Sequence, residues 1–217
     1  MENFMFRSKY LNPLTDFGFH KLFGTEAYKE LLIDFLNEVI QEEGEITGLE
    51  YLPESHWGPK KEDRSAVFDI YCKNEFGYFI VEMQIARQTY FKDRCVYYST
   101  FPIQEQALKG EKWKYKLAPV YTIAILDFES LDEQPEYYQE VKLIDFRTKE
   151  VFYDKFTYFL LELRKFNKRQ DELVSNFERW IYLLKHLSRL ENRPVELQGR
   201  VFDMLFRAAE IARFTPE

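Results

Sequence analysis

Cysteine, histidine and glycine-rich motifs are scarce in this sequence. Its two cysteines, Cys72 and Cys95, follow no metal-binding or redox spacing, so we interpret them as reduced thiols of a cytosolic protein. The three histidines, His20, His56 and His186, are scattered along the chain, which gives zinc binding and histidine catalysis little support. The sequence also lacks a glycine-rich phosphate-binding loop and a nucleophile elbow.

Long apolar runs are absent as well. No stretch approaches the roughly 20 apolar residues that a membrane-spanning helix needs. The amino end, MENFMFRSKYLNPL, lacks the charged-then-apolar pattern and the small-residue cleavage site of a signal peptide. We therefore expect a cytoplasmic protein that makes no use of a membrane.

An excess of positive charge is missing too, because 37 acidic residues outnumber 30 basic ones and the net charge is −7. This balance argues against a protein that coats nucleic acid through charge alone. It leaves room for an enzyme that acts on nucleic acid, since a local basic surface is enough for binding. With 46% hydrophobic residues, the 217-residue chain is long enough for one domain with a substantial core, or a core with an appendage.

The spacing of apolar residues predicts both helices and strands. Residues 26–42 carry apolar side chains every three or four positions, the pattern of an amphipathic helix. Residues 119–128 are nearly all apolar or β-branched, which is typical of a strand covered on both faces. Other predicted elements are a short helix from Asp16, strands at 46–52, 138–153 and 156–166, a charged loop at 56–64, and helices at 90–109, after Ser175 and at 195–213. This order predicts an α/β or α+β fold with a mixed sheet.

Residues 67–85 are predicted to form the β-hairpin around which the function is organised. Two runs rich in Val, Ile, Phe and Tyr flank the turn at residues 74–77, and this turn pairs position i with position 151 − i. Asp69 then lies opposite Glu82, and Gln84 points to the same face of the sheet. Two facing carboxylates repel each other unless a cation lies between them, and Mg²⁺ favours such a site. The alternative interpretation is a pair of solvated carboxylates on an exposed face.

Four segments in this order resemble the PD-(D/E)XK nuclease superfamily, and in particular the bacterial PD-(D/E)XK nuclease family transposases, which are related to the Rpn recombination-promoting nucleases. The segments are NPLTDFGFHKLF at 12–23, FDIY at 68–71, FIVEMQ at 79–84 and RCVYY at 94–98. The resemblance implies a restriction-endonuclease-like core, with a central mixed sheet flanked by helices. It assigns residues 1–130 to this core and residues 131–217 to a C-terminal extension of strands and helices packed on the same domain.

The resemblance also implies the identity of the site residues. Asp69 and Glu82 match the metal-binding acids of the family, and the main-chain carbonyl of Met83 matches a further metal ligand. Gln84 stands where the superfamily has lysine, although a Glu-x-Gln version is usual in this subfamily. Asp16 is our candidate for the acid that the first helix contributes, with Glu26 as the second choice. A role for Asp16 as a helix cap, and for Gln84 as a simple hydrogen-bonding side chain, remain alternatives.

The activity implied is Mg²⁺-dependent (or Mn²⁺-dependent) hydrolysis of DNA phosphodiester bonds, linked to mobile elements or recombination. The metal ion lowers the pKa of its bound water and clamps the phosphate, while Gln84 orients the water through hydrogen bonds. Arg87, Lys92 and Arg94 are candidate phosphate contacts, with a solvated helix face as the alternative.

Two further expectations come from the resemblance alone. DNA is the expected partner, and a homodimer is expected because many nucleases of the superfamily cut both strands as dimers. The family's proteins are usually longer, so a shortened copy is expected. The rival interpretation is a module that keeps the fold, has weak or no catalytic activity, and binds DNA or protein; the glutamine at the lysine position and the acidic net charge favour it.

Overall fold

The computed structural model describes residues 8–41, 44–56, 66–107, 114–128 and 133–211. The chain divides into two compact units, Glu42–Lys165 and the combination of Met1–Gln41 with Phe166–Glu217. We call the first the sheet unit and the second the helical unit. None of the helices in the described ranges is long and apolar enough to cross a bilayer.

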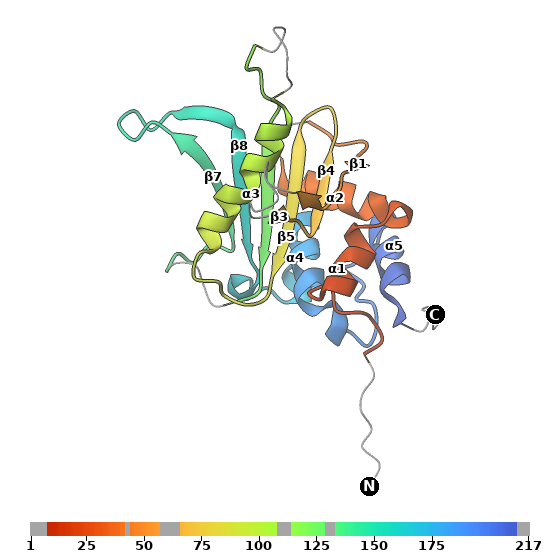
Figure 1. Cartoon of the computed structure of the whole chain (residues 1–217). Helices are drawn as coiled ribbons and strands as arrows, with labels where there is room; N and C mark the ends of the chain where they lie inside the picture. Colours follow the sequence, from red (N-terminus) through yellow and green to blue (C-terminus); the bar gives the residue numbers. More distant parts are fainter. Residues whose placement is uncertain (1–7, 42–43, 57–65, 108–113, 129–132, 212–217) are drawn as a thin grey trace. The chain divides into compact units, whose positions relative to one another are not determined.

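The sheet unit contains a mixed sheet of six strands in the order β1-β4-β5-β6-β8-β7 (Figure 1). These strands are β1 (Glu50–Tyr51), β4 (Ile70–Lys73), β5 (Tyr78–Gln84), β6 (Val120–Leu126), β7 (Tyr138–Ile144) and β8 (Val151–Glu162). The β5, β6 and β8 strands run parallel to one another, and the other pairings in this sheet are antiparallel. A separate ribbon pairs β2 (Ser55–His56) with β3 (Ala66–Val67). The predicted mixed-sheet α/β fold is confirmed.

The β4–β5 hairpin has the predicted register. Ile70 pairs with Val81 and Lys73 pairs with Tyr78, so the paired numbers sum to 151 as the turn chemistry required. The Asn74 side-chain oxygen accepts hydrogen bonds from the N–H groups of the two residues that close the turn, at 2.9 and 3.2 Å. Gly77 is needed there because a Cβ atom would lie only 2.5 Å from the carbonyl oxygen of Pro119.

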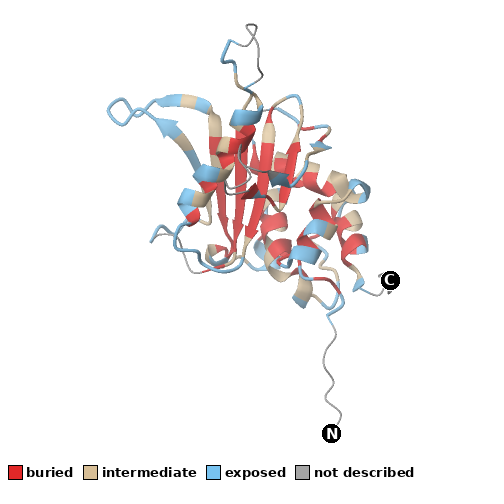
Figure 2. Cartoon of the chain, viewed as in Figure 1, coloured by how far each residue is buried: buried red, intermediate tan, exposed pale blue. Residues whose placement is uncertain are grey.

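The β6 strand is buried along its whole length, as the sequence predicts for a strand covered on both faces (Figure 2). On one face, helix α3 (Phe91–Glu105) packs through Phe91 and Cys95 against Ala124, Leu126 and Leu160. On the other, aromatic rings form a row from β5 to β7, made of Phe79, Tyr121, Phe159 and Tyr138. Both cysteines of the chain are buried thiols that form no disulfide within the described residues.

The helical unit contains α1 (Asp16–Phe23), α2 (Lys29–Val39), α4 (Asn176–His186) and α5 (Arg200–Ala209), with short 3₁₀ turns at Glu26–Tyr28, Gln170–Glu172 and Leu187–Arg189. The Thr15 and Ser175 side chains cap α1 and α4 by accepting backbone N–H bonds. Trp180 is fully buried and its ring lies 5.7 Å from those of Phe23, Phe35 and Phe202. This aromatic cluster is the core of the unit.

Several predicted boundaries are wrong or fall outside the described residues. Of the strand expected at 46–52, only Glu50–Tyr51 forms a strand with β4, and the Leu52 N–H donates one more bond to the carbonyl of Tyr71. The helix expected from 195 begins at Arg200, since Gly199 before it has a positive φ of 122° that a helix does not accommodate. Of the charged loop expected at 56–64, His56 belongs instead to β2, and residues 57–64 lie outside the described residues. A division into residues 1–130 and 131–217 stays a prediction, and the sheet unit and the helical unit have other boundaries.

Candidate functional site: a buried carboxylate pair on the β4–β5 hairpin

Asp69 and Glu82 interlock at the open end of the β4–β5 hairpin. The Asp69 N–H donates a 3.3 Å hydrogen bond to Oε1 of Glu82, and the Asp69 Oδ2 atom accepts a 2.7 Å bond from the N–H of Met83. Each acid therefore touches the backbone of the other strand. The β4–β5 register ends one residue short, at Ile70–Val81, and these two bonds bring Asp69 and Glu82 together as the sequence predicts.

Burial makes the charge of Glu82 costly. Its side chain is 5% exposed, and the loss of hydration raises its pKa to about 8. Repulsion from the neighbouring Asp69 carboxylate raises this pKa as well, whereas Arg94 and the Asp69 N–H lower it. Near neutral pH the Glu82 carboxyl accordingly holds its proton unless additional positive charge is brought to it.

Gln84 and Arg94 supply a second layer of polar contacts beside this pair. The Arg94 Nη2 atom donates a 2.7 Å hydrogen bond to Oε1 of Gln84, while the Gln84 Nε2 atom donates to the carbonyl of Ala86 at 2.9 Å. The same Arg94 Nη2 atom lies 3.6 Å from Oε2 of Glu82. Gln84 therefore fixes a guanidinium at the place where the superfamily pattern has a lysine.

Helix α3 positions Arg94 through two aromatic rings. The guanidinium carbon lies 5.5 Å from the ring centroid of Tyr98 and 5.9 Å from that of Phe91, distances at which cation–π attraction operates. Residues 94 and 98 are one helical turn apart, so they share a face of α3. Burial raises the pKa of the Tyr98 hydroxyl, and the Glu82 carboxylate raises it too. Tyr98 and Arg94 thus belong to the environment of the carboxylate pair.

The donor set fits a hard divalent cation such as Mg²⁺. Two adjacent carboxylates supply oxygen ligands, and Mg²⁺ ordinarily keeps several water molecules besides one or two carboxylates. The described ranges contain no cluster of three or more His, Cys, Asp or Glu side chains that can hold a metal ion. A metal ion at this site would accordingly depend on Asp69 and Glu82, with the Met83 carbonyl as the further ligand that the resemblance implies.

Four further residues are predicted to take part in the site. Asp16 and Glu26 belong to the helical unit, where Asp16 is the first residue of α1 and Glu26 forms a 2.5 Å ion pair with Lys29. Thr15, rather than Asp16, is the residue that caps α1. Arg87 and Lys92 are exposed in the segment between β5 and the first turn of α3. The roles of these four residues in the site stay predictions.

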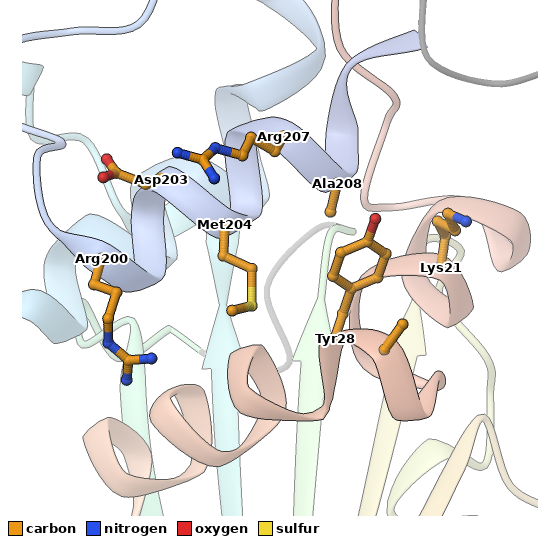
Figure 3. A pocket seen from close by; sticks show the side chains of 8 residues that line it. Lys21, Tyr28, Arg200, Asp203, Met204, Arg207 and Ala208 are labelled. Carbon is orange, nitrogen blue, oxygen red and sulfur yellow. The ribbon is translucent and has the colours of Figure 1, made fainter.

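A pocket of about 460 Å³ lies in the helical unit, between α5 and the first helices (Figure 3). Lys21, Arg200 and Arg207 contribute positive charge to its lining, and Asp203 contributes a carboxylate. Arg200 forms an ion pair with Glu30, and Asp203 forms one with Arg193. The lining of this pocket therefore lacks the paired carboxylates of the hairpin, and we assign no metal chemistry to it.

The sequence places Arg94 at the substrate but gives no sign of its contact with Gln84 and Glu82. The sequence does indicate that Arg94 and Tyr98 share a helix face, because they are four residues apart near the start of the predicted helix that follows the strand of Glu82. The spacing within the helix does not indicate which residues of β5 this face contacts.

Comparison with known proteins identifies the family of the chain. The model of one family, described as PD-(D/E)XK nuclease family transposase, matches residues 13–217. No curated protein and no solved structure matches the chain. The family match covers nearly the whole sequence. The chain therefore belongs to the PD-(D/E)XK nuclease family transposases.

Proposed function

We propose that this protein is a Mg²⁺-dependent DNA endonuclease that hydrolyses phosphodiester bonds, with a role in mobile-element movement or recombination. The observation that carries the proposal is the interlocked pair of Asp69 and Glu82, held on a hairpin whose register the sequence predicts. Membership of the nuclease family supports a nuclease-related or transposase-related role. DNA as the substrate, a cytoplasmic location, and Mg²⁺ rather than Mn²⁺ as the metal ion are parts of the same proposal.

Each residue of the site has a defined task under this proposal. Asp69 and Glu82 bind the metal ion as carboxylates, and Glu82 loses to solvent the proton that burial otherwise retains on it. When bound, the metal ion lowers the pKa of a coordinated water and withdraws charge from the phosphate. Gln84 holds the Arg94 guanidinium by its side-chain oxygen, so a fixed positive charge lies beside the acids without a lysine in the motif.

The proposal also gives the basic residues that follow β5 a role in binding the substrate. Arg87 and Lys92 are exposed, and their side chains are proposed to contact DNA phosphates. Arg94 is proposed to favour the negative charge that develops on the phosphate, because its guanidinium is already oriented by Gln84 and by two aromatic rings. Asp16 is proposed as a supporting acid, with Glu26 as the alternative.

A plasmid-nicking assay with matched variants tests the proposal. Asp69→Asn and Glu82→Gln replace an ionisable carboxyl with an amide of the same shape, whereas Asp171→Asn changes an exposed acid of the helical unit as a control. We expect nicking that requires Mg²⁺ or Mn²⁺, that is abolished by EDTA, and that is lost in the two hairpin variants but kept in the control. Equal nicking by all four proteins, or nicking by none of them, contradicts the enzyme proposal.

A second candidate function rests on the 3.6 Å approach of Arg94 to Glu82. This guanidinium partly neutralises the acid pair without a metal ion, and Gln84 cannot act as a general base in the way an amine can. The candidate is a module that keeps the nuclease fold and binds DNA or protein with weak or no cleavage. DNA binding that is unaffected by Mg²⁺, together with no nicking by the wild type, is the result that favours it.

A further inference from the structure

Strand β7 is the outer strand of the six-stranded sheet. It pairs with β8 on one side, and the described part of the chain places no strand on its other side. An outer strand carries a row of backbone donors and acceptors directed away from the sheet, which is a template for pairing with another strand. The side chains of Tyr138–Ile144 therefore determine which kind of partner can pair with this edge.

The β7–β8 hairpin exposes several large apolar side chains to solvent. Val141 is 43% exposed, and Phe146 and Phe152 near the tip are 81% and 79% exposed (Figure 2). Leu143, Ile144 and Val151 are exposed as well. Contiguous apolar groups of this kind mark contact surfaces in soluble proteins.

The hairpin is nonetheless well ordered at its tip. The Asp145 side-chain oxygen accepts hydrogen bonds from the N–H groups of Arg147 and Thr148, at 2.7 and 3.0 Å. The Asp145 N–H donates to the carbonyl of Glu150, and the Lys149 N–H donates to that of Asp145. These bonds fix the path of the backbone through the turn.

The sequence of β7 is complementary to itself in the antiparallel direction. When two copies pair about Val141, position i faces position 282 − i of the other copy, so Val141 faces Val141. Glu140 then faces Lys142 twice, and Tyr138 faces Ile144 twice. Glu140 and Lys142 form a 2.5 Å ion pair with each other within each copy, so the pairing brings two such ion pairs together across the axis. Opposite charges and aromatic–β-branched pairs directly across a sheet are both stabilising. We propose that β7 is a homodimer interface, at which two copies of this protein pair their β7 strands antiparallel about a two-fold axis at Val141.

The irregularity in the sheet does not obstruct this pairing. The register shifts lie between Lys142 and Ile144, and the additional residues at each shift belong to β8 rather than β7. A strand with extra residues is the one that bends. The outer strand is therefore continuous through the positions that the second copy would meet.

A second copy fits this edge better than DNA does. Residues 138–155 contain four basic and four acidic side chains, so the β7–β8 hairpin has no net positive charge to attract phosphates. Val141 and Gln139 also line an apolar pocket of about 240 Å³ beside α3. Pairing about Val141 brings two such pockets next to each other and shields both from water. The balanced charge and the apolar lining are properties of a protein–protein contact.

Charge exchange at the interface gives a test that needs no nuclease activity. Glu140→Lys puts lysine against lysine across the axis, and Lys142→Glu puts glutamate against glutamate. We expect wild type to be a dimer in analytical ultracentrifugation, and each variant alone to dimerise at least tenfold more weakly. Mixing the two variants restores opposite charges at both positions and should restore the dimer. A monomeric wild type, or variants whose mixture is no more dimeric than either alone, overturns the proposal.

A cysteine at the axis tests the register directly. Directly opposed residues of an antiparallel pair have Cα atoms about 4.5–5.5 Å apart, within the range that a disulfide spans. Val141→Cys should therefore form a cross-linked dimer under mild oxidation, whereas Ile144→Cys, a control that faces Tyr138 in this register, should not. The native Cys72 and Cys95 are buried and do not compete. Cross-linking by Ile144→Cys but not by Val141→Cys refutes the register, and unchanged thermal unfolding shows that both variants are folded.

Discussion

The Arg94 Nη2 atom donates a 2.7 Å hydrogen bond to the side-chain oxygen of Gln84, a residue that stands at the lysine position of the superfamily pattern. An ammonium group at that position would meet the Arg94 guanidinium and would offer it no acceptor. The glutamine is therefore the side chain that suits a site in which α3 supplies the cation. This relationship gives a physical reason for glutamine at position 84 of this chain.

We expect Gln84→Lys to destabilise the protein, because it removes the hydrogen bond and adds repulsion between two cations. A hydrogen bond to a charged group contributes about 1.5–3 kcal/mol, so a loss of this order is expected in urea unfolding. Gln84→Met removes the bond without adding charge and is the matched control. The double variant Gln84→Lys with Arg94→Gln should recover part of the loss. If Gln84→Lys and Gln84→Met lower the free energy of unfolding by the same amount, the expected repulsion between the lysine and Arg94 is absent.

Glu82 should make metal-free stability depend on pH. Its pKa rises from 4.5 to about 8 on folding, so between these values the folded protein binds more protons than the unfolded chain. The free energy of unfolding then falls as pH rises through this window, and the contribution is fully present only below the lower value. We expect Glu82→Gln to remove this part of the dependence. The measurement is chemical unfolding in EDTA across the window, for wild type and variant, and identical pH profiles would contradict the assignment.

Arg94 and a divalent cation should compete for the acid pair. Arg94→Met keeps the length of the side chain but removes the charge that lies 3.6 Å from Glu82. We expect Mg²⁺ to raise the melting temperature of this variant more than that of wild type, because binding of the ion no longer opposes a fixed cation. We also expect weaker DNA nicking, since the oriented charge is lost. Arg189→Met, which changes an exposed cation of the helical unit, serves as the control.

In the helical unit, Trp180→Phe should lower stability by about 1–3 kcal/mol. The indole Nε1 donates a 2.6 Å hydrogen bond to Oδ1 of Asp34, whose pKa is raised chiefly by burial. Phenylalanine preserves most of the packing against Phe23 and Phe35 but leaves that carboxylate without its donor. Urea unfolding measures the loss, and Asp34→Asn keeps an acceptor for the indole as the control. A Trp180→Phe variant as stable as wild type would show that the bond contributes little.

Local sequence is enough to predict the β4–β5 hairpin and the facing of its acids. Turn chemistry at Asn74 and Gly77 and the two-residue period of a strand are local properties, so they set the register that places Asp69 against Glu82. The buried strand β6 and the caps at Thr15 and Ser175 follow from equally local patterns. The metal-binding and catalytic roles of the acids stay predictions.

Long-range packing, by contrast, sets which groups surround those acids and where several elements end. The approach of Arg94 depends on how α3 crosses the sheet, which residue spacing within the helix does not encode. The position of β7 at the edge depends on β8 pairing parallel to β6, a contact between strands about thirty residues apart. The short pairing of β1 depends on its partner β4 in the same way. Local chemistry specifies each element, but the free energy of long-range packing selects the neighbours.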